Sequence, residues 1–336
     1  MQRNTLNSLI PLFFLAACSG SDNGLTGPGN DGDPPPPPAG FTIDSANGME
    51  VSQVAYQSVV TSGDFAGLAG SGLTANSGGG LAKPTMPQHP GGVLARLLEK
   101  VPVGPTVVDC AAGGTVTVTM EIADLLLLTQ GGLSQGDTIL NEYANCNEGF
   151  GETVDGDVDS EVDAFAGNIL ANIYDFTMTL TLTDFQVATA TDVITANGDG
   201  TATLNTMNAP YVEASVSGNS MTTDTNSSSE TLSDYSSVQT LDAGVIPSPY
   251  TMDASGTLDS SLLAGAITYS TPVMFQGFDA DYPVAGELLI AGEGSSARII
   301  AQANGVDVVI EIYSNETGTG TPDDTINTTW AELAAG

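Results

Sequence analysis

The sequence contains very few cationic side chains. Five Lys and Arg residues stand against 40 Asp and Glu among 336 residues, which gives a formal net charge of −35. Only 13% of the residues are charged, so the imbalance comes from missing cations rather than from an excess of acids. A protein that binds nucleic acid needs basic side chains to neutralise phosphates, and an anionic surface repels a chain of this charge. The composition therefore excludes nucleic acid as a partner.

Histidine and tryptophan are almost absent as well, with one residue of each. A Ser–His–Asp site or a Cys nucleophile would have to use His89, which lies in a Pro- and Gly-rich segment, and no G-x-S-x-G motif accompanies it. Zinc catalysis usually takes two or three His or Cys ligands, and no Walker or Rossmann glycine pattern is present. We interpret Trp330 as a core residue on the last strand rather than as a platform for a sugar. The sequence thus predicts no catalytic residue and no enzymatic activity.

The N-terminus, by contrast, carries a clear targeting signal. Arg3 precedes an apolar stretch from Leu9 to Ala17, which is shorter than the ~20 residues that span a bilayer and is typical of a secretory signal. Leu15-Ala16-Ala17-Cys18 resembles the lipobox of bacterial lipoproteins. The resemblance implies cleavage before Cys18 and lipidation of that residue, with palmitate among the acyl chains and the membrane as a partner through this anchor. Ser19 follows where an Asp would imply inner-membrane retention, so the resemblance implies the outer membrane, and leaves open the periplasmic or the surface side.

Composition divides the rest of the chain. Residues 18–40 are rich in Gly and Pro, and the run Pro34–Pro38 favours polyproline II, which makes this segment a tether. Residues 41–336 form the predicted β-rich domain, in which 41–109 is a helical and loop entry and 110–336 holds antiparallel strands. Apolar spacing predicts short helices over 44–60 and 93–100.

Alternation with a period of two dominates the chain after residue 110. The segments 114–122, 176–185 and 305–313 alternate Val, Ile, Leu, Met or Phe with mostly Thr, Asp or Glu, which is typical of strands with one buried face. Similar runs occur at 137–146, 153–163, 193–205, 210–217, 264–275, 284–292, 296–303 and 325–332. Short Gly, Asn and Asp segments between them suit hairpins, and no long helical pattern interrupts them. We therefore predict an all-β fold: a large antiparallel meander in a strongly curved or barrel-like sheet, with one or two short N-terminal helices.

Two cysteines remain once Cys18 is assigned to lipid. In an oxidising compartment Cys110 and Cys146 are best interpreted as a disulfide. The bond would close a loop of about 37 residues, for which a chain-entropy model gives roughly 4 kcal/mol of stabilisation.

Acidic side chains alternate within residues 152–165. On a strand, five carboxylates would project from one face: Asp155, Asp157, Asp159, Glu161 and Asp163. The spacing departs from an EF-hand, because Ser160 and Ala166 replace its Gly and Glu, but a strand-based Ca²⁺ site stays open, since Ca²⁺ accepts carboxylate oxygens flexibly. We favour the alternative, a solvated acidic face that opposes edge-to-edge aggregation, and no other cofactor is predicted.

These features lead to one functional hypothesis and two alternatives. The first is a non-enzymatic, lipid-anchored protein of the cell envelope with a structural, adhesion or ligand-binding role. The alternatives are a carboxylate-dependent hydrolase of envelope polysaccharide, which needs two carboxyl groups about 5–9.5 Å apart in a cleft, and a carrier of an apolar ligand inside the curved sheet. The sequence does not identify the protein or small molecule that is bound.

Overall fold

A computed structural model describes residues 41–71, 105–147, 153–189, 193–278 and 281–335, with side chains left undescribed at 63–71. All of them belong to one unit of the chain, which extends from Pro38 to Gly336. Within these ranges, no helix combines the length and the apolar character needed to cross a membrane.

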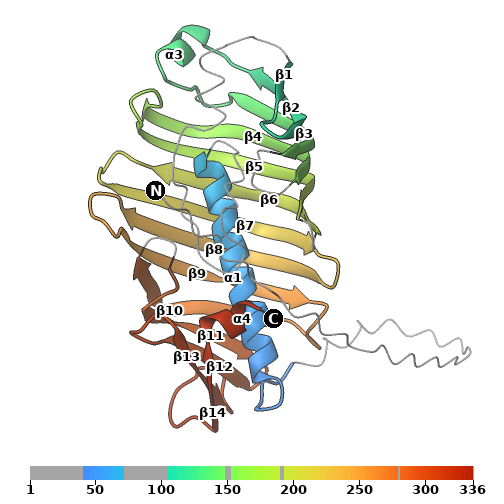
Figure 1. Cartoon of the computed structure of the whole chain (residues 1–336), viewed down its shortest axis with the longest axis vertical. Coiled ribbons are helices and arrows are strands. Elements are labelled where there is room, and N and C mark those ends of the chain that lie inside the picture. The colour runs from blue at the N-terminus through green and yellow to red at the C-terminus, as the bar shows by residue number, and fades with distance from the viewer. Residues whose placement is uncertain (1–40, 72–104, 148–152, 190–192, 279–280, 336) are drawn as a thin grey trace, which may run out of the picture. The chain divides into compact units, whose positions relative to one another are not determined.

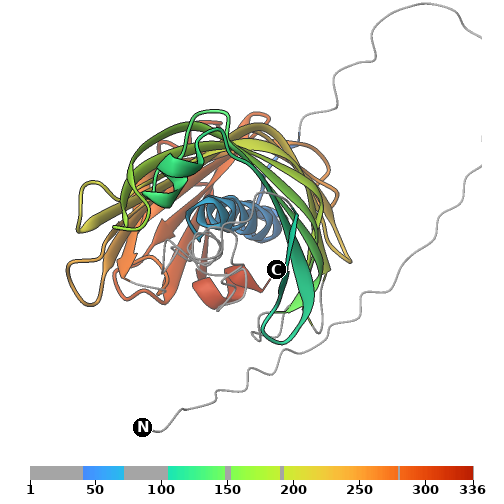
Figure 2. The ribbon, with the colours of Figure 1, turned by 90° about the horizontal axis from the view of Figure 1, so that it is seen from above.

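The described residues form fourteen strands that follow one another in chain order across a single sheet, each antiparallel to its neighbours. The predicted all-β antiparallel meander is therefore confirmed. The sheet is strongly curved but open, with β1 and β14 at its two edges (Figures 1 and 2). The strands are β1 (Thr106–Asp109), β2 (Gly113–Glu121), β3 (Thr138–Asn147), β4 (Thr153–Asn168), β5 (Ile173–Ala188), β6 (Val193–Asn205), β7 (Tyr211–Asp224), β8 (Ser229–Asp242), β9 (Pro249–Ser260), β10 (Ile267–Phe278), β11 (Ala285–Gly292), β12 (Ser295–Ala301), β13 (Asp307–Tyr313) and β14 (Asp324–Thr329).

Alternation of side chains along the strands builds one face of the core. In β5, Phe176, Met178, Leu180 and Leu182 are buried, while the threonines between them are half-buried or exposed. This is the arrangement expected when one face of a sheet is covered and the other is in contact with water.

Helix α1 (Gly48–Ser71) lies on the concave side of the sheet, enclosed by its curve (Figure 2). It contacts β6–β9 and β11–β13, and Val51, Val54 and Val59 are almost completely buried. The helix is longer than the predicted span of 44–60, because it continues through a Gly-containing segment whose sequence has little helical pattern. The second predicted helix, over 93–100, lies outside the described residues.

The chain near its C-terminus differs from the sequence prediction. The strand predicted over 325–332 ends at Thr329, and Trp330 begins the short helix α4 (Trp330–Ala334). Thr329 and Glu332 form a capping box, in which each side chain accepts a hydrogen bond from the other residue's backbone N–H. Trp330 is fully buried, as predicted for a core residue, but it reaches the core from a helix rather than from a strand.

Two strand glycines make room for a tyrosine. Tyr235 of β8 extends across Gly218 of β7 towards Gly200 of β6, and its hydroxyl donates to the Asp199 carbonyl oxygen at 3.2 Å. A Cβ atom at either glycine would lie within 2.6 Å of the tyrosine oxygen. The glycines therefore allow an aromatic side chain to cover adjacent strands in the core.

Candidate functional site

The acidic row of β4 lies on the face of the sheet away from the core. Val154, Val158 and Val162 are buried, whereas Asp159 and Glu161 are exposed and the other three acids are half-buried. The alternation in the sequence is thus reproduced in three dimensions. The neighbouring strand β5 presents threonines to the row, since Thr181 pairs with Asp159 and Thr179 with Glu161.

Hydrogen bonds and one unfavourable pair surround this row. The backbone N–H of Asn145 donates to Asp155 at 2.8 Å, and the Thr179 hydroxyl donates to Asp163 at 2.9 Å. Asp157 lies directly opposite Glu142 of β3, which places two like charges side by side. Sequence analysis missed Glu142, although its place on the predicted strand 137–146 next to 153–163 was a signal for this pairing.

No group of three or more His, Cys, Asp or Glu side chains in the described part of the chain is arranged to hold a metal ion. The carboxylates of β4 follow one another along the strand instead of converging on one point. The Ca²⁺ hypothesis stays a prediction, and the geometry gives it no support.

Cys110 and Cys146 lie at disulfide distance, with their Cα atoms 5.5 Å apart. Both side chains are buried, and the pair connects the turn before β2 to the end of β3 near one edge of the sheet. Cys18, the predicted lipidation site, and His89 lie outside the described residues.

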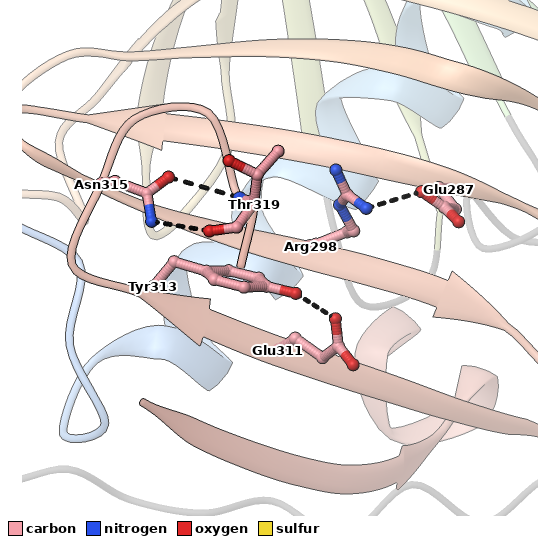
Figure 3. A network of polar contacts seen from close by, with 6 residues as sticks. All are labelled: Glu287, Arg298, Glu311, Tyr313, Asn315 and Thr319. Carbon is pink, nitrogen blue, oxygen red and sulfur yellow. Dashed lines mark hydrogen bonds and ion pairs between the residues drawn. The ribbon is translucent and has the colours of Figure 1, made fainter. Parts of the chain in front are cut away.

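The only Lys or Arg in the described ranges, Arg298, lies between two glutamates (Figure 3). It pairs across the strands with Glu311 of β13, and its Nη1 is 3.3 Å from Glu287 Oε2 on β11. Its Nε is buried and has no hydrogen-bond partner. Because two carboxylates flank one guanidinium group, the cluster stays net negative and is poorly suited to bind an anion.

A loop folds over this cluster. The Tyr313 hydroxyl donates to Glu311, and burial together with this hydrogen bond raises the pKa of Tyr313 to about 12. Ser296 donates to the Asn315 carbonyl oxygen at 2.6 Å, and Asn315 also bonds the backbone of Thr319 (Figure 3). These bonds hold residues 314–323 against the sheet, so the arrangement supports the structure of this end of the molecule.

Glu230 is a partly buried carboxyl group where helix and sheet meet. The Ser58 hydroxyl of α1 donates to Glu230 Oε2 at 3.1 Å. Burial raises the pKa of Glu230, and the hydrogen bond from Ser58 opposes part of that rise. Its hydrogen-bond partner is a hydroxyl group and not a second carboxyl group, so the contact connects α1 to β8 and does not resemble the acid pair of a glycosidase.

Comparison with protein-family models, with curated proteins and with solved structures found no match for this chain. The functional argument therefore depends on the chain's own residues.

Proposed function

We propose that this chain is a lipid-anchored protein of the outer membrane that acts as a scaffold for binding or adhesion and not as an enzyme. The observation that carries the proposal is the position of α1, which occupies the concave side of the sheet over β6–β9 and β11–β13. The side chains of the helix and of these strands form a continuous core. What such a body offers to other molecules is its outer face and its two rows of turns.

The same observation bears on the carrier hypothesis. A carrier needs open space along the apolar inner face of the sheet, and over these strands α1 takes that place. A rigid body with a filled core on a long tether fits a binding or structural role better.

Anchoring is tested by changing Cys18. We expect the wild-type chain, expressed in a Gram-negative bacterium, to incorporate labelled palmitate and to fractionate with the outer membrane. Cys18→Ser should lose both properties, because the sulfur that would carry the lipid is gone, while Ser19→Ala serves as the matched control and should behave as wild type. Equal palmitate incorporation in Cys18→Ser and wild type would contradict the proposal.

A further inference from the structure

Every second connection of an antiparallel meander falls at the same edge of the sheet. The segment containing α3 (Leu125–Thr129) and the turns β4–β5, β6–β7 and β8–β9 all lie at one such edge, on the left in Figure 1. Large apolar side chains stand out into solvent along it. We call this set the apolar rim: Leu126, Leu170, Ile173, Met207, Tyr211 and Ile246.

The exposure of the rim is high for such side chains. Ile246 is 96% exposed, Leu126 68% and Leu170 61%. Exposed apolar side chains are ordinary when they are scattered, but a row of them indicates a surface that another molecule covers.

The opposite edge provides a comparison within the same sheet. The β7–β8 turn consists of Thr225, Asn226, Ser227 and Ser228, and its hydroxyl groups bond one another. Across the described turns that join β5 to β10 at this edge, Leu262 is the one large apolar side chain that is exposed. The apolar character therefore belongs to one edge and is not a general property of the turns.

Hydrogen bonds join the neighbouring turns of the rim into one structure. Ile169 N donates to the Gly131 carbonyl oxygen at 2.8 Å, which ties the β4–β5 turn to the segment of α3. The Thr206 hydroxyl donates to the Asn172 carbonyl oxygen at 3.2 Å, and Ala243 N donates to the Pro210 carbonyl oxygen at 3.0 Å. The rim is thus held as a continuous row, which lowers the entropy lost when a partner binds.

The charge beside the rim limits what can cover it. Asp124 caps α3 two residues before Leu126, Asp175 follows Ile173 by two residues, and Asp242 pairs across the strands with Tyr211. No described Lys or Arg belongs to this edge, because Arg298 lies within β12. A second copy of the chain or an anionic bilayer would bring further negative charge, whereas a cationic surface would complement the acids.

The spacing of the rim suggests the form of the partner. Successive turns are two strands apart, or about 9.6 Å at ~4.8 Å per strand, so four of them extend over about 29 Å. In an α-helix, residues seven apart are separated by about 10.5 Å, and roughly 20 residues cover 30 Å. An apolar residue at every seventh position of a helix can therefore meet each turn in succession.

We propose that the apolar rim is the docking surface for a basic amphipathic helix of a partner protein, whose apolar stripe is flanked by Lys or Arg. This inference rests on the proposed binding role, but it does not depend on the anchor. The predicted tether joins the body at Phe41, whose carbonyl oxygen accepts from Glu293 N in the β11–β12 turn, at the edge opposite the rim. The rim consequently lies away from the point where the tether enters.

The test uses the full chain with Cys18→Ser and a synthetic Leu/Lys peptide of about 21 residues, with Leu in a heptad pattern. Binding is measured by titration calorimetry in about 0.5 M NaCl, where screening leaves little attraction from distant charges. We expect Leu126→Ser, Leu170→Ser and Ile246→Ser together to weaken binding at least about tenfold, since buried apolar area is lost. Leu262→Ser at the opposite edge is the matched control and should bind as the reference chain does.

Two control peptides and two further measurements complete the experiment. A Leu/Glu peptide and a Ser/Lys peptide of the same length should bind weakly, because one lacks the cations and the other lacks the apolar stripe. Equal binding of the Leu/Lys peptide by the triple variant and the reference chain would overturn the proposal. So would rim-dependent dimerisation in sedimentation, or rim-dependent binding to phosphatidylcholine vesicles. None of these outcomes alters palmitate labelling at Cys18, so failure of the rim and failure of the anchor remain distinguishable.

Discussion

At the scale of single residues, Glu230 connects stability to pH. Its pKa is raised in the folded chain, so the native state holds a proton that the unfolded state releases at lower pH. Folding stability therefore falls as the pH rises from the pKa of the unfolded state through that of the folded state, and the penalty persists above both. Glu230→Gln keeps an acceptor for Ser58 and removes the penalty, so we expect a higher melting temperature at pH 7 than for wild type.

The control for this change is Glu213→Gln, which removes one negative charge from an exposed position of β7. Any gain common to the two variants reflects the net charge of the molecule. The gain specific to Glu230→Gln should disappear near pH 3.5, where the wild-type carboxyl group is also protonated. Thermal melts followed by circular dichroism at several pH values measure both effects, and a difference independent of pH would contradict the assignment.

Trp330 supports a second prediction at this scale. Its ring centroid lies 4.9 Å from that of Tyr56, 5.7 Å from that of Phe275 and 6.1 Å from that of Tyr282, and its Nε1 donates to the Pro283 carbonyl oxygen at 3.0 Å. We expect Trp330→Ala to lower the free energy of unfolding by about 3–5 kcal/mol, because it leaves a cavity and an unpaired carbonyl group. Trp330→Phe should cost less. Urea denaturation measures both, and equal losses would show that ring packing contributes little.

At the scale of elements, Cys110 and Cys146 join the short edge strand β1 and its hairpin to β3. β1 pairs only with β2, through four residues, so it depends on this connection more than the central strands do. We expect reduction of the cysteine pair to increase amide hydrogen exchange in β1 and β2 and to leave β7 and β8 nearly unchanged. Exchange is measured by mass spectrometry with and without dithiothreitol. A uniform increase over all strands would instead show that the bond stabilises the whole fold.

The elements also show how far the sequence predicts the fold. The period of two located β5 and β6 because their inner positions are mostly apolar. It missed β8, since Ser237 and Gln239 face the core there and are buried, which breaks the alternation. It also missed α4, although Thr329 followed by Glu332 three residues later is a capping-box signal.

The candidate surfaces could be predicted only in part. The acidic row of β4 follows from strand alternation alone, because period two places its members on one face. The apolar rim does not. Leu126, Met207 and Ile246 are far apart in the sequence and separated by polar residues, and only the strand order brings their turns to one edge.

At the scale of the whole molecule, the net charge of −35 opposes compact folding through mutual repulsion of the acids. We expect the melting temperature to rise by several degrees between about 0.02 M and 0.5 M NaCl, because the Debye length falls from about 20 Å to about 4 Å. Glu213→Gln should show a slightly smaller rise, since it carries one negative charge less. A melting temperature independent of salt would mean that the acids are too far apart to affect folding.

The same molecule-wide charge gives the comparison against which a Ca²⁺ site must be judged. Any divalent cation will stabilise so acidic a chain by screening, so stabilisation by Ca²⁺ alone is not evidence for a site. Because the carboxylates of β4 do not converge and no metal-holding group occurs among the described residues, we expect CaCl₂ and MgCl₂ to raise the melting temperature equally at matched ionic strength. An additional Ca²⁺ effect that is abolished by Asp157→Asn with Asp159→Asn, but retained in Glu213→Gln, would show instead that the acidic row binds this ion.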